Sequence, residues 1–138
     1  CEILVKTNKL PVQFDGPVYG NAKVLALQQS DIFVFTPNMP EGHPYCIIEA
    51  LSAKLPIIST NQGAITESVI DQWNGFIVKT HSPEEIAEKI CYLAFNRTER
   101  ELMAINSRKI YEEKFTADAM ATNYRQIFDA VIKEDFQD

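Results

Sequence analysis

Two glutamates, Glu41 and Glu49, stand eight residues apart in the segment E-G-H-P-Y-C-I-I-E, on either side of a Gly-x-Pro loop. Most residues of Tyr45–Ala53 are apolar, which predicts a largely buried helix, and an ionised carboxylate is rarely buried without a partner. Helical side chains lean toward the amino end, so Glu49 can reach back toward the loop that holds Glu41. Paired carboxylates accept hydrogen bonds from vicinal hydroxyls, as in ribose or a hexose. Spacing alone equally allows a solvated loop residue and a surface carboxylate.

The loop before this helix offers a second kind of contact. Gly42 lets the backbone approach a ligand closely, and Pro44 fixes φ at the start of the helix. The amides of Tyr45–Ile47 lie at the positive end of the helix and suit a phosphate or a sugar hydroxyl. His43 could donate to a sugar hydroxyl, but a lone loop histidine is more often an exposed surface residue.

The elements that position these residues follow from the hydrophobic pattern. Short β-branched or aromatic runs alternate with helical stretches, as in an α/β layered domain with a mainly parallel sheet. The loop that holds Glu41 and the loop of Asn61–Glu67, which contains Gly63, should therefore open on the same edge of the sheet. The second loop could also be an ordinary connection. Strands are expected at Val12–Phe14, Ile32–Phe35, Pro56–Ser59 and Phe76–Val78, and helices near Asn21–Gln29, Tyr45–Ala53 and Ala64–Val69; Ile3–Val5 fits either a strand or a helical turn.

The second half of the chain is predicted to be helical. Ser82 and Glu85 have the spacing of a capping box, which predicts a helix that ends near Phe95. A further helix is expected over Arg97–Phe115, and Thr116 can cap a last one. No repeat or linker is present, so we expect one Rossmann-like domain over residues 1–138.

Composition argues against several classes of protein. A chain of 138 residues, 46% of them hydrophobic, can bury one good core, and its net charge of −6 argues against a nucleic-acid partner. The widely spaced cysteines Cys1, Cys46 and Cys91 and two histidines predict no metal site or disulfide framework. There is no Walker loop, nucleophile elbow or dinucleotide fingerprint, which argues against an NTPase, a hydrolase or a dinucleotide-binding enzyme. No apolar run is long enough to span a bilayer, and we expect a cytoplasmic protein. The first residue, Cys rather than Met, suggests part of a longer protein.

Several stretches of the chain resemble one family in order and spacing. Ser30–Pro37 is similar to its A-D-x-x-x-x-P-S strand, and Glu41–Ala53 to its E-G-x-P-x-x-x-x-E-A-m-A signature. Pro56–Thr60, Gly63–Glu67 and Asn74–Val78 resemble its P-V-I-a-T, G-G-x-x-E and x-G-f-l-v segments. The family is the group 1, GT4-type retaining glycosyltransferases, which have the GT-B fold. The resemblance extends over most of the chain.

The resemblance implies most of the C-terminal, donor-binding half of a two-domain enzyme. It implies transfer of a sugar from a UDP- or GDP-sugar to an acceptor with retention at the anomeric carbon, without a metal or other cofactor, in polysaccharide or glycan biosynthesis. Glu49 would hold the ribose of the donor, and Glu41, the candidate catalytic residue, would hold the donor sugar near its reacting carbon. The acceptor-binding half, with any peripheral membrane association, would lie outside this chain, which would be inactive alone. The other candidate donor-binding residues are Gly42, His43, Pro44, Tyr45, Cys46 and Gly63.

The chain departs from the family pattern at a few points. Lys54 and Ala64 stand where the family often has glycine, and the family's diphosphate-binding Arg and Lys would precede Val12–Gly16, outside this chain. A non-catalytic Rossmann-like module, acting through nucleotide-sugar or protein binding, is the alternative. A signalling receiver domain fits less well, because Asp15 and Asp31 flank strands without forming an acidic cluster.

Overall fold

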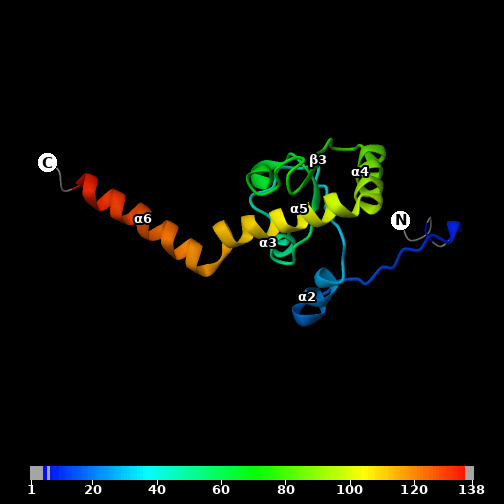
Figure 1. The fold of residues 1–138 in the computed structure, drawn as a ribbon, viewed down its shortest axis with the longest axis horizontal. Helices are drawn as coiled ribbons and strands as arrows, with labels where there is room; N and C mark the ends of the chain where they lie inside the picture. The colour runs from blue at the N-terminus through cyan, green and yellow to red at the C-terminus, as the bar shows by residue number, and fades with distance from the viewer. Residues whose placement is uncertain (1–4, 6, 136–138) are drawn as a thin grey trace.

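The computed structural model describes residue 5 and residues 7–135 (Figure 1). Its centre is a parallel sheet in the order β1-β2-β3, with Phe33 of β1 paired to Ile57 of β2, and Ile57 to Gly75 of β3. Helices connect successive strands, so the predicted α/β class with a parallel sheet is confirmed. The strands are β1 (Phe33–Phe35), β2 (Ile57–Thr60) and β3 (Gly75–Val78), and the helices are α2 (Gly20–Gln28), α3 (Tyr45–Ser52), the 3₁₀ helix η1 (Gly63–Glu67), α4 (Pro83–Phe95), α5 (Arg97–Ile110), the π-helical turn η2 (Tyr111–Phe115) and α6 (Ala117–Asp135).

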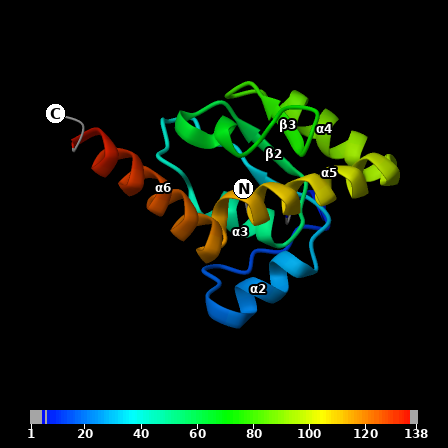
Figure 2. The ribbon, with the colours of Figure 1, turned by 60° about the vertical axis from the view of Figure 1, so that its left-hand side comes forward.

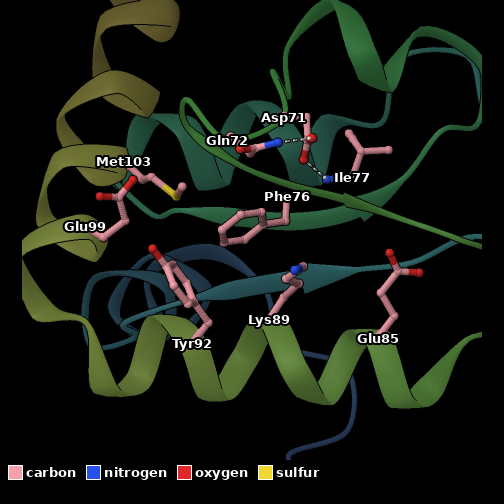
Figure 3. A pocket seen from close by; sticks show the side chains of 9 residues that line it. All are labelled: Asp71, Gln72, Phe76, Ile77, Glu85, Lys89, Tyr92, Glu99 and Met103. Carbon is pink, nitrogen blue, oxygen red and sulfur yellow. Dashed lines mark hydrogen bonds between the residues drawn. The ribbon is translucent and has the colours of Figure 1, made fainter.

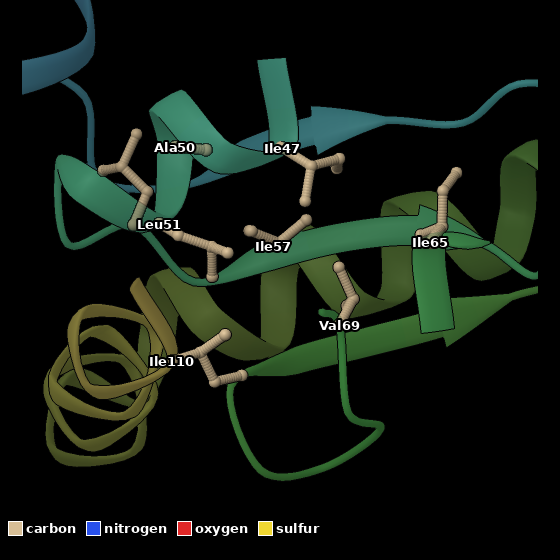
Figure 4. Close-up of a cluster of buried hydrophobic side chains, with 8 residues drawn as sticks. Ile47, Ala50, Leu51, Ile57, Ile65, Val69 and Ile110 are labelled. Carbon is tan, nitrogen blue, oxygen red and sulfur yellow. The ribbon is translucent and has the colours of Figure 1, made fainter. Parts of the chain in front are cut away.

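One face of the sheet is covered by α3. Ile57 on β2 packs against Ile47 and Leu51 of α3 and against Ile110 at the end of α5, all of them at most 2% exposed (Figure 4). The apolar positions of α3 are therefore buried, as its sequence predicts. Burial of a side chain of this size contributes about 1.5–3 kcal/mol, so this layer holds α3 firmly against the sheet.

The other face is covered by α4 and the first half of α5. Successive residues of a strand point to opposite faces, so Ile58 faces away from α3 and packs with Phe76, Leu93 and Met103. Helix α5 thus contacts both faces, with Met103 on one and Ile110 on the other. The helix links the two halves of the core.

Helix α5 also fixes the amino end of β3. Asn106 Nδ2 donates to the Trp73 carbonyl at 2.7 Å, and Asn74 Nδ2 donates to the Ser68 carbonyl at 3.0 Å and to Ser107 Oγ at 3.4 Å. Asn74 and Ser107 are fully buried, and each has its hydrogen-bond partners. Side chains of α5 therefore occupy the amino edge of the sheet at β3.

Helix α6 projects away from the rest of the described chain (Figures 1 and 2). As predicted, Thr116 caps it, because Thr116 Oγ1 accepts a hydrogen bond from Ala119 N at 3.2 Å. Its large apolar side chains from Met120 to Ile132 are between 46% and 63% exposed. None of the described helices is long and apolar enough to cross a membrane.

The prediction of a strand at Val12–Phe14 is wrong. The segment is extended, but Val12 and Phe14 are half exposed and no described strand pairs with them. A strand needs a neighbour that completes its hydrogen-bond ladder, and an extended pattern without one stays irregular. Of the ambiguous segment Ile3–Val5, Val5 is helical, and Ile3 and Leu4 lie outside the described residues.

Two predicted helix starts also differ in detail. Helix α4 begins where expected, but Ser82 makes no side-chain cap, and Glu85 Oε2 accepts a hydrogen bond from Lys79 N at 3.0 Å instead. The capping box is therefore wrong, because Glu85 reaches past Ser82 to the preceding loop. The helix expected at Ala64–Val69 is the 3₁₀ helix η1, and an adjacent turn follows it.

Candidate functional site

The carboxyl ends of β1 and β2 are tied together by hydroxyl groups on β2. Ser59 Oγ donates to the Phe35 carbonyl at 2.5 Å, and Thr60 Oγ1 donates to the Pro37 carbonyl at 2.5 Å. Both hydroxyl residues are buried, so these bonds are shielded from water. They set the path of the loop from Thr36 to Pro44. The sequence shows the Ser-Thr pair at the end of a strand, and only the structure shows which carbonyls the two hydroxyls contact.

The loops after β1 and β2 touch each other, as their common edge predicts. Ala64 N donates to the Gly42 carbonyl at 3.1 Å. Gly63 has φ +60°, and a Cβ atom there would overlap the carbonyl oxygen of Glu41 and lie 2.8 Å from its carbonyl carbon. Only glycine tolerates both conditions, so Gly63 supports the backbone of Glu41. Gly42 differs, because a Cβ there would meet no atom within 4 Å and the space beside it is open.

The amino end of α3 faces this edge. Pro44 is the N-cap residue, with φ −63° and ψ 124°, and no side chain caps the helix. The Ile47 amide donates to the Pro44 carbonyl at 3.0 Å. The expectation that the Ile47 amide would be free is therefore wrong, because this amide already has a partner within the first turn.

The Cys46 thiol reports on both glutamates. Burial raises the pKa of this thiol above its ordinary value, and hydrogen bonds from the amides of Ile47 and of Cys46 itself lower it. The carboxylates of Glu49 and Glu41 both raise the pKa further, because a nearby negative charge disfavours the thiolate. Both carboxylates therefore lie within electrostatic reach of one atom at the start of α3.

The two carboxylates differ in their surroundings. Glu49 Oε1 pairs with Lys23 Nζ of α2 at 2.5 Å, and the two side chains are 37% and 40% exposed. Both line a small hollow of about 120 Å³ between α2 and α3. A half-exposed ion pair is worth about 0–1 kcal/mol, so a ligand can rearrange it. The Glu41 carboxylate has no hydrogen-bond or ion-pair partner among the described residues.

Lys23 is the residue of this site that sequence reasoning missed. It stands 26 residues before Glu49 in α2, a helix without buried residues. Nothing in the local pattern distinguishes Lys23 from any other surface lysine. Only the packing of α2 beside α3 brings the ammonium group to Glu49.

His43 is turned toward the interior of the domain. Its Nε2 lies 2.8 Å from Ser68 Oγ, and its ring meets the Phe115 ring edge to face at 5.1 Å between centroids. Because Ser68 is fully buried, this contact anchors the loop to η1 and η2. Nδ1 is the remaining ring nitrogen for a hydroxyl of a ligand, and that contact stays a prediction.

A family model described as "Glycosyl transferases group 1" matches residues 4–110. The chain belongs to this family. It is 31% identical over 132 residues to the capsular polysaccharide biosynthesis glycosyltransferase CapM of Staphylococcus aureus, which covers 96% of this chain and 31% of CapM. The chain spans about a third of the length of the curated relatives it matches.

Solved structures of glycosyltransferases have the same fold. The C-terminal domain of LpcC, a group 1 protein from Francisella tularensis, matches with a TM-score of 0.73 and 28% identity, covering 84% of this chain and 60% of that one. HepE from Anabaena, solved in complex with UDP and glucose, matches with a TM-score of 0.80 and 19% identity over 94% of this chain and 35% of HepE. The fold of this group 1 chain is therefore the Rossmann-like fold of these neighbours.

The structure shows why the family pattern favours glycine at the position of Lys54. Lys54 follows the last turn of α3 with φ +60°. Lys54 N donates to the Leu51 carbonyl and Leu55 N to the Ala50 carbonyl, each at 3.1 Å, which is the Schellman pattern. This position favours glycine, as the resemblance to the group 1 pattern implies. The departure therefore lies at the end of a helix, where the left-handed backbone favours glycine.

Proposed function

We propose that this chain is the donor-binding half of a retaining glycosyltransferase that transfers a sugar from a UDP- or GDP-sugar to an acceptor. The observation that carries the proposal is the Glu41 carboxylate, which has no partner among the described residues and is held at the carboxyl edge of the sheet beside the amino end of α3. Glu49 lies on α3 itself. Ligands of parallel α/β sheets bind at this edge. Membership of the group 1 family, the similarity to the glycosyltransferase CapM and the fold shared with HepE, which was solved with UDP and glucose, support this class of reaction.

Each residue has a role in this proposal. Glu49 accepts hydrogen bonds from the ribose hydroxyls, and Lys23 positions it in the hollow between α2 and α3. The open space beside Gly42 admits the diphosphate and the sugar close to the backbone. Glu41 faces the donor sugar, where its carboxylate holds hydroxyl groups and stabilises positive charge that develops at the anomeric carbon.

The chemical step follows from the charges at the end of α3. As the bond between the anomeric carbon and the diphosphate breaks, negative charge grows on the leaving phosphate. The amides of Tyr45 and Cys46, at the positive end of the helix dipole, stabilise this charge. An acceptor hydroxyl then attacks the anomeric carbon from the face that the leaving group occupied, and its proton passes to the departing phosphate, so the configuration is retained. The acceptor-binding half comes from outside this chain, and we propose a cytoplasmic enzyme of glycan biosynthesis.

Ligand-observed NMR of the chain with UDP-, GDP- and ADP-sugars tests this function. We expect one of the three donors to bind, and Glu49→Ala and Glu41→Ala each to weaken binding by about tenfold. Glu101→Ala is the matched control, since Glu101 pairs with Arg97 on the exposed side of α5. It should leave binding unchanged.

Two further results discriminate between the roles. Loss of Glu49 should weaken the binding of a nucleoside diphosphate that has no sugar. Loss of Glu41 should weaken only the binding of the complete nucleotide sugar. If a donor binds and neither change weakens it, the assignment of the two carboxylates is wrong. If no nucleotide sugar binds to the chain even when the rest of the enzyme is supplied, the proposed function is wrong.

A further inference from the structure

A second concave surface lies away from Glu41 and Glu49, between β3 and α4. It is a hollow of about 460 Å³ whose centre is formed by Phe76 on β3 and Tyr92 and Lys89 on α4 (Figure 3). The two rings are nearly perpendicular, with centroids 5.6 Å apart, and Tyr92 is 43% exposed. Figure 3 shows Asp71 and Gln72 across the hollow from α4, and Glu99 at the end where Tyr92 lies.

A second hollow lies beside this one, toward the carboxyl edge of the sheet. This neighbouring hollow of about 380 Å³ is lined by Asn61, Gln62 and Lys79, and it shares Ile77 and Glu85 with the first. The two hollows are neighbours along β3 and are together called the β3 groove. Its far end reaches the loop that precedes Gly63, the glycine that supports Glu41.

The lining of the β3 groove combines an exposed aromatic ring with amides and carboxylates. The apolar C–H face of a pyranose ring packs on an aromatic side chain, while its hydroxyls need donors and acceptors around the rim. Tyr92 provides the ring, and Asn61, Gln62 and Gln72 provide both donors and acceptors. A saccharide matches this combination.

The charges of the β3 groove favour a neutral ligand. Three carboxylates line it, those of Asp71, Glu85 and Glu99, against the ammonium groups of Lys79 and Lys89. Lys89 is itself engaged, with Nζ 2.9 Å from Glu88 and 5.2 Å from the centroid of the Phe76 ring. A phosphate-rich or otherwise polyanionic chain would meet an excess of negative charge.

The outer edge of β3 is closed to an added peptide strand. The Ile77 amide donates to Asp71 Oδ1 at 2.9 Å, and the Gly75 carbonyl accepts a hydrogen bond from the Gln72 amide at 2.8 Å. A peptide that extends the sheet needs these backbone groups free. The groove therefore offers side chains, not a backbone ladder, to its ligand.

We propose that the β3 groove binds a neutral saccharide chain of more than one sugar unit, at a site separate from the donor site. Two neighbouring hollows that share Ile77 and Glu85 together exceed the space that one sugar ring needs, which is why the ligand is a chain. The inference rests on the proposed function in one respect only, which is that the saccharide chain is identified as the acceptor or product of the transfer. Binding itself requires no nucleotide sugar.

The test is a titration of the ¹⁵N-labelled chain with maltotetraose and with N-acetylchitotetraose, followed by amide chemical shifts. We expect one of the two to shift the amides of Ile77 and Tyr92. Tyr92→Ala should weaken binding by about tenfold or more, as for an aromatic anchor, whereas Tyr92→Phe should retain it. Phe95→Ala is the matched control, because Phe95 lies on the same helix, is 88% exposed and is outside the groove.

The outcomes separate this proposal from the proposed function. Glu41→Ala and Glu49→Ala should leave tetrasaccharide binding unchanged, and Tyr92→Ala should leave nucleotide-sugar binding unchanged. The ¹⁵N spectrum of Tyr92→Ala, compared with that of the wild type, shows whether a loss of binding is due to unfolding, because this change also removes the ring contact with Phe76. The proposal is overturned if neither tetrasaccharide shifts the groove amides at millimolar concentration, or if binding survives Tyr92→Ala.

Discussion

Replacement of Gly63 by alanine tests how the two loops of the site are joined. Gly63 has φ +60°, and an alanine in this left-handed region costs about 1–2 kcal/mol. The new Cβ would also overlap the Glu41 carbonyl oxygen, which is backbone and cannot rotate away, and overpacking of this kind costs about 1–3 kcal/mol. We therefore expect Gly63→Ala to lower the free energy of unfolding by roughly 2–5 kcal/mol, a large part of the about 5–15 kcal/mol typical of a domain.

The measurement is urea unfolding followed by circular dichroism, with donor binding measured on the same samples. Gly42→Ala is the control, because its Cβ would meet nothing within 4 Å and its φ lies outside the left-handed region. That change should alter stability by less than about 1 kcal/mol. The two substitutions add the same methyl group to neighbouring loops, so a difference between them isolates the contact of Gly63 with Glu41.

The loop can also relieve the overlap by moving. In that case the loss of stability falls to the backbone cost of about 1–2 kcal/mol, and the displaced Glu41 weakens donor binding instead. A Gly63→Ala variant that unfolds at the wild-type urea concentration and binds the donor as tightly as wild type would refute the reasoning. The loops would then not touch in solution as they do in the structure.

Two further substitutions test the end and the beginning of α3. Lys54→Gly should raise the free energy of unfolding by about 0.5–1 kcal/mol, since it removes the left-handed strain at φ +60° at the entropic cost of a glycine; an unchanged urea midpoint would contradict this. Glu41→Gln should lower the pKa of the Cys46 thiol, because it removes a carboxylate that raises it, and Cys46 should then react faster with iodoacetamide at neutral pH. Peptide mass spectrometry follows the alkylation, with the exposed Cys91 as internal reference, and an unmoved pH profile for Cys46 would count against the proximity of Glu41.

The strands show which parts of the fold a local pattern decides. Ile57 and Ile58 lie in a short β-branched run that is buried on both faces, and its strand forms where expected. Val12–Phe14 has the same local character but is irregular and exposed. The difference is the presence of a neighbouring strand, which supplies the hydrogen-bond ladder, and a local pattern contains no information about it.

Helix starts show a similar division. The Ser-Pro-x-Glu pattern correctly predicts that a helix begins at Pro83, because proline at the first position and acidic residues in the first turn favour a start. The pattern does not decide which amide the Glu85 carboxylate accepts from. The preceding loop brings Lys79 N to it, so that the bond forms outside the helix.

For the candidate site, the sequence by itself determined which residue types are present and on which kind of element they lie: Glu41 on a loop, Glu49 on a largely buried helix, and both near the carboxyl edge of a parallel sheet. The hydrophobic periodicity shows which segments are helices and strands, and the order of the segments shows which loops follow a strand. Both can be obtained from the sequence alone. The tertiary structure alone decided that Lys23 pairs with Glu49, that Glu41 has no such partner among the described residues, and that Gly63 supports the Glu41 backbone. These contacts join segments 22 to 26 residues apart, and their formation depends on how α2 and η1 pack, which the local sequence does not specify.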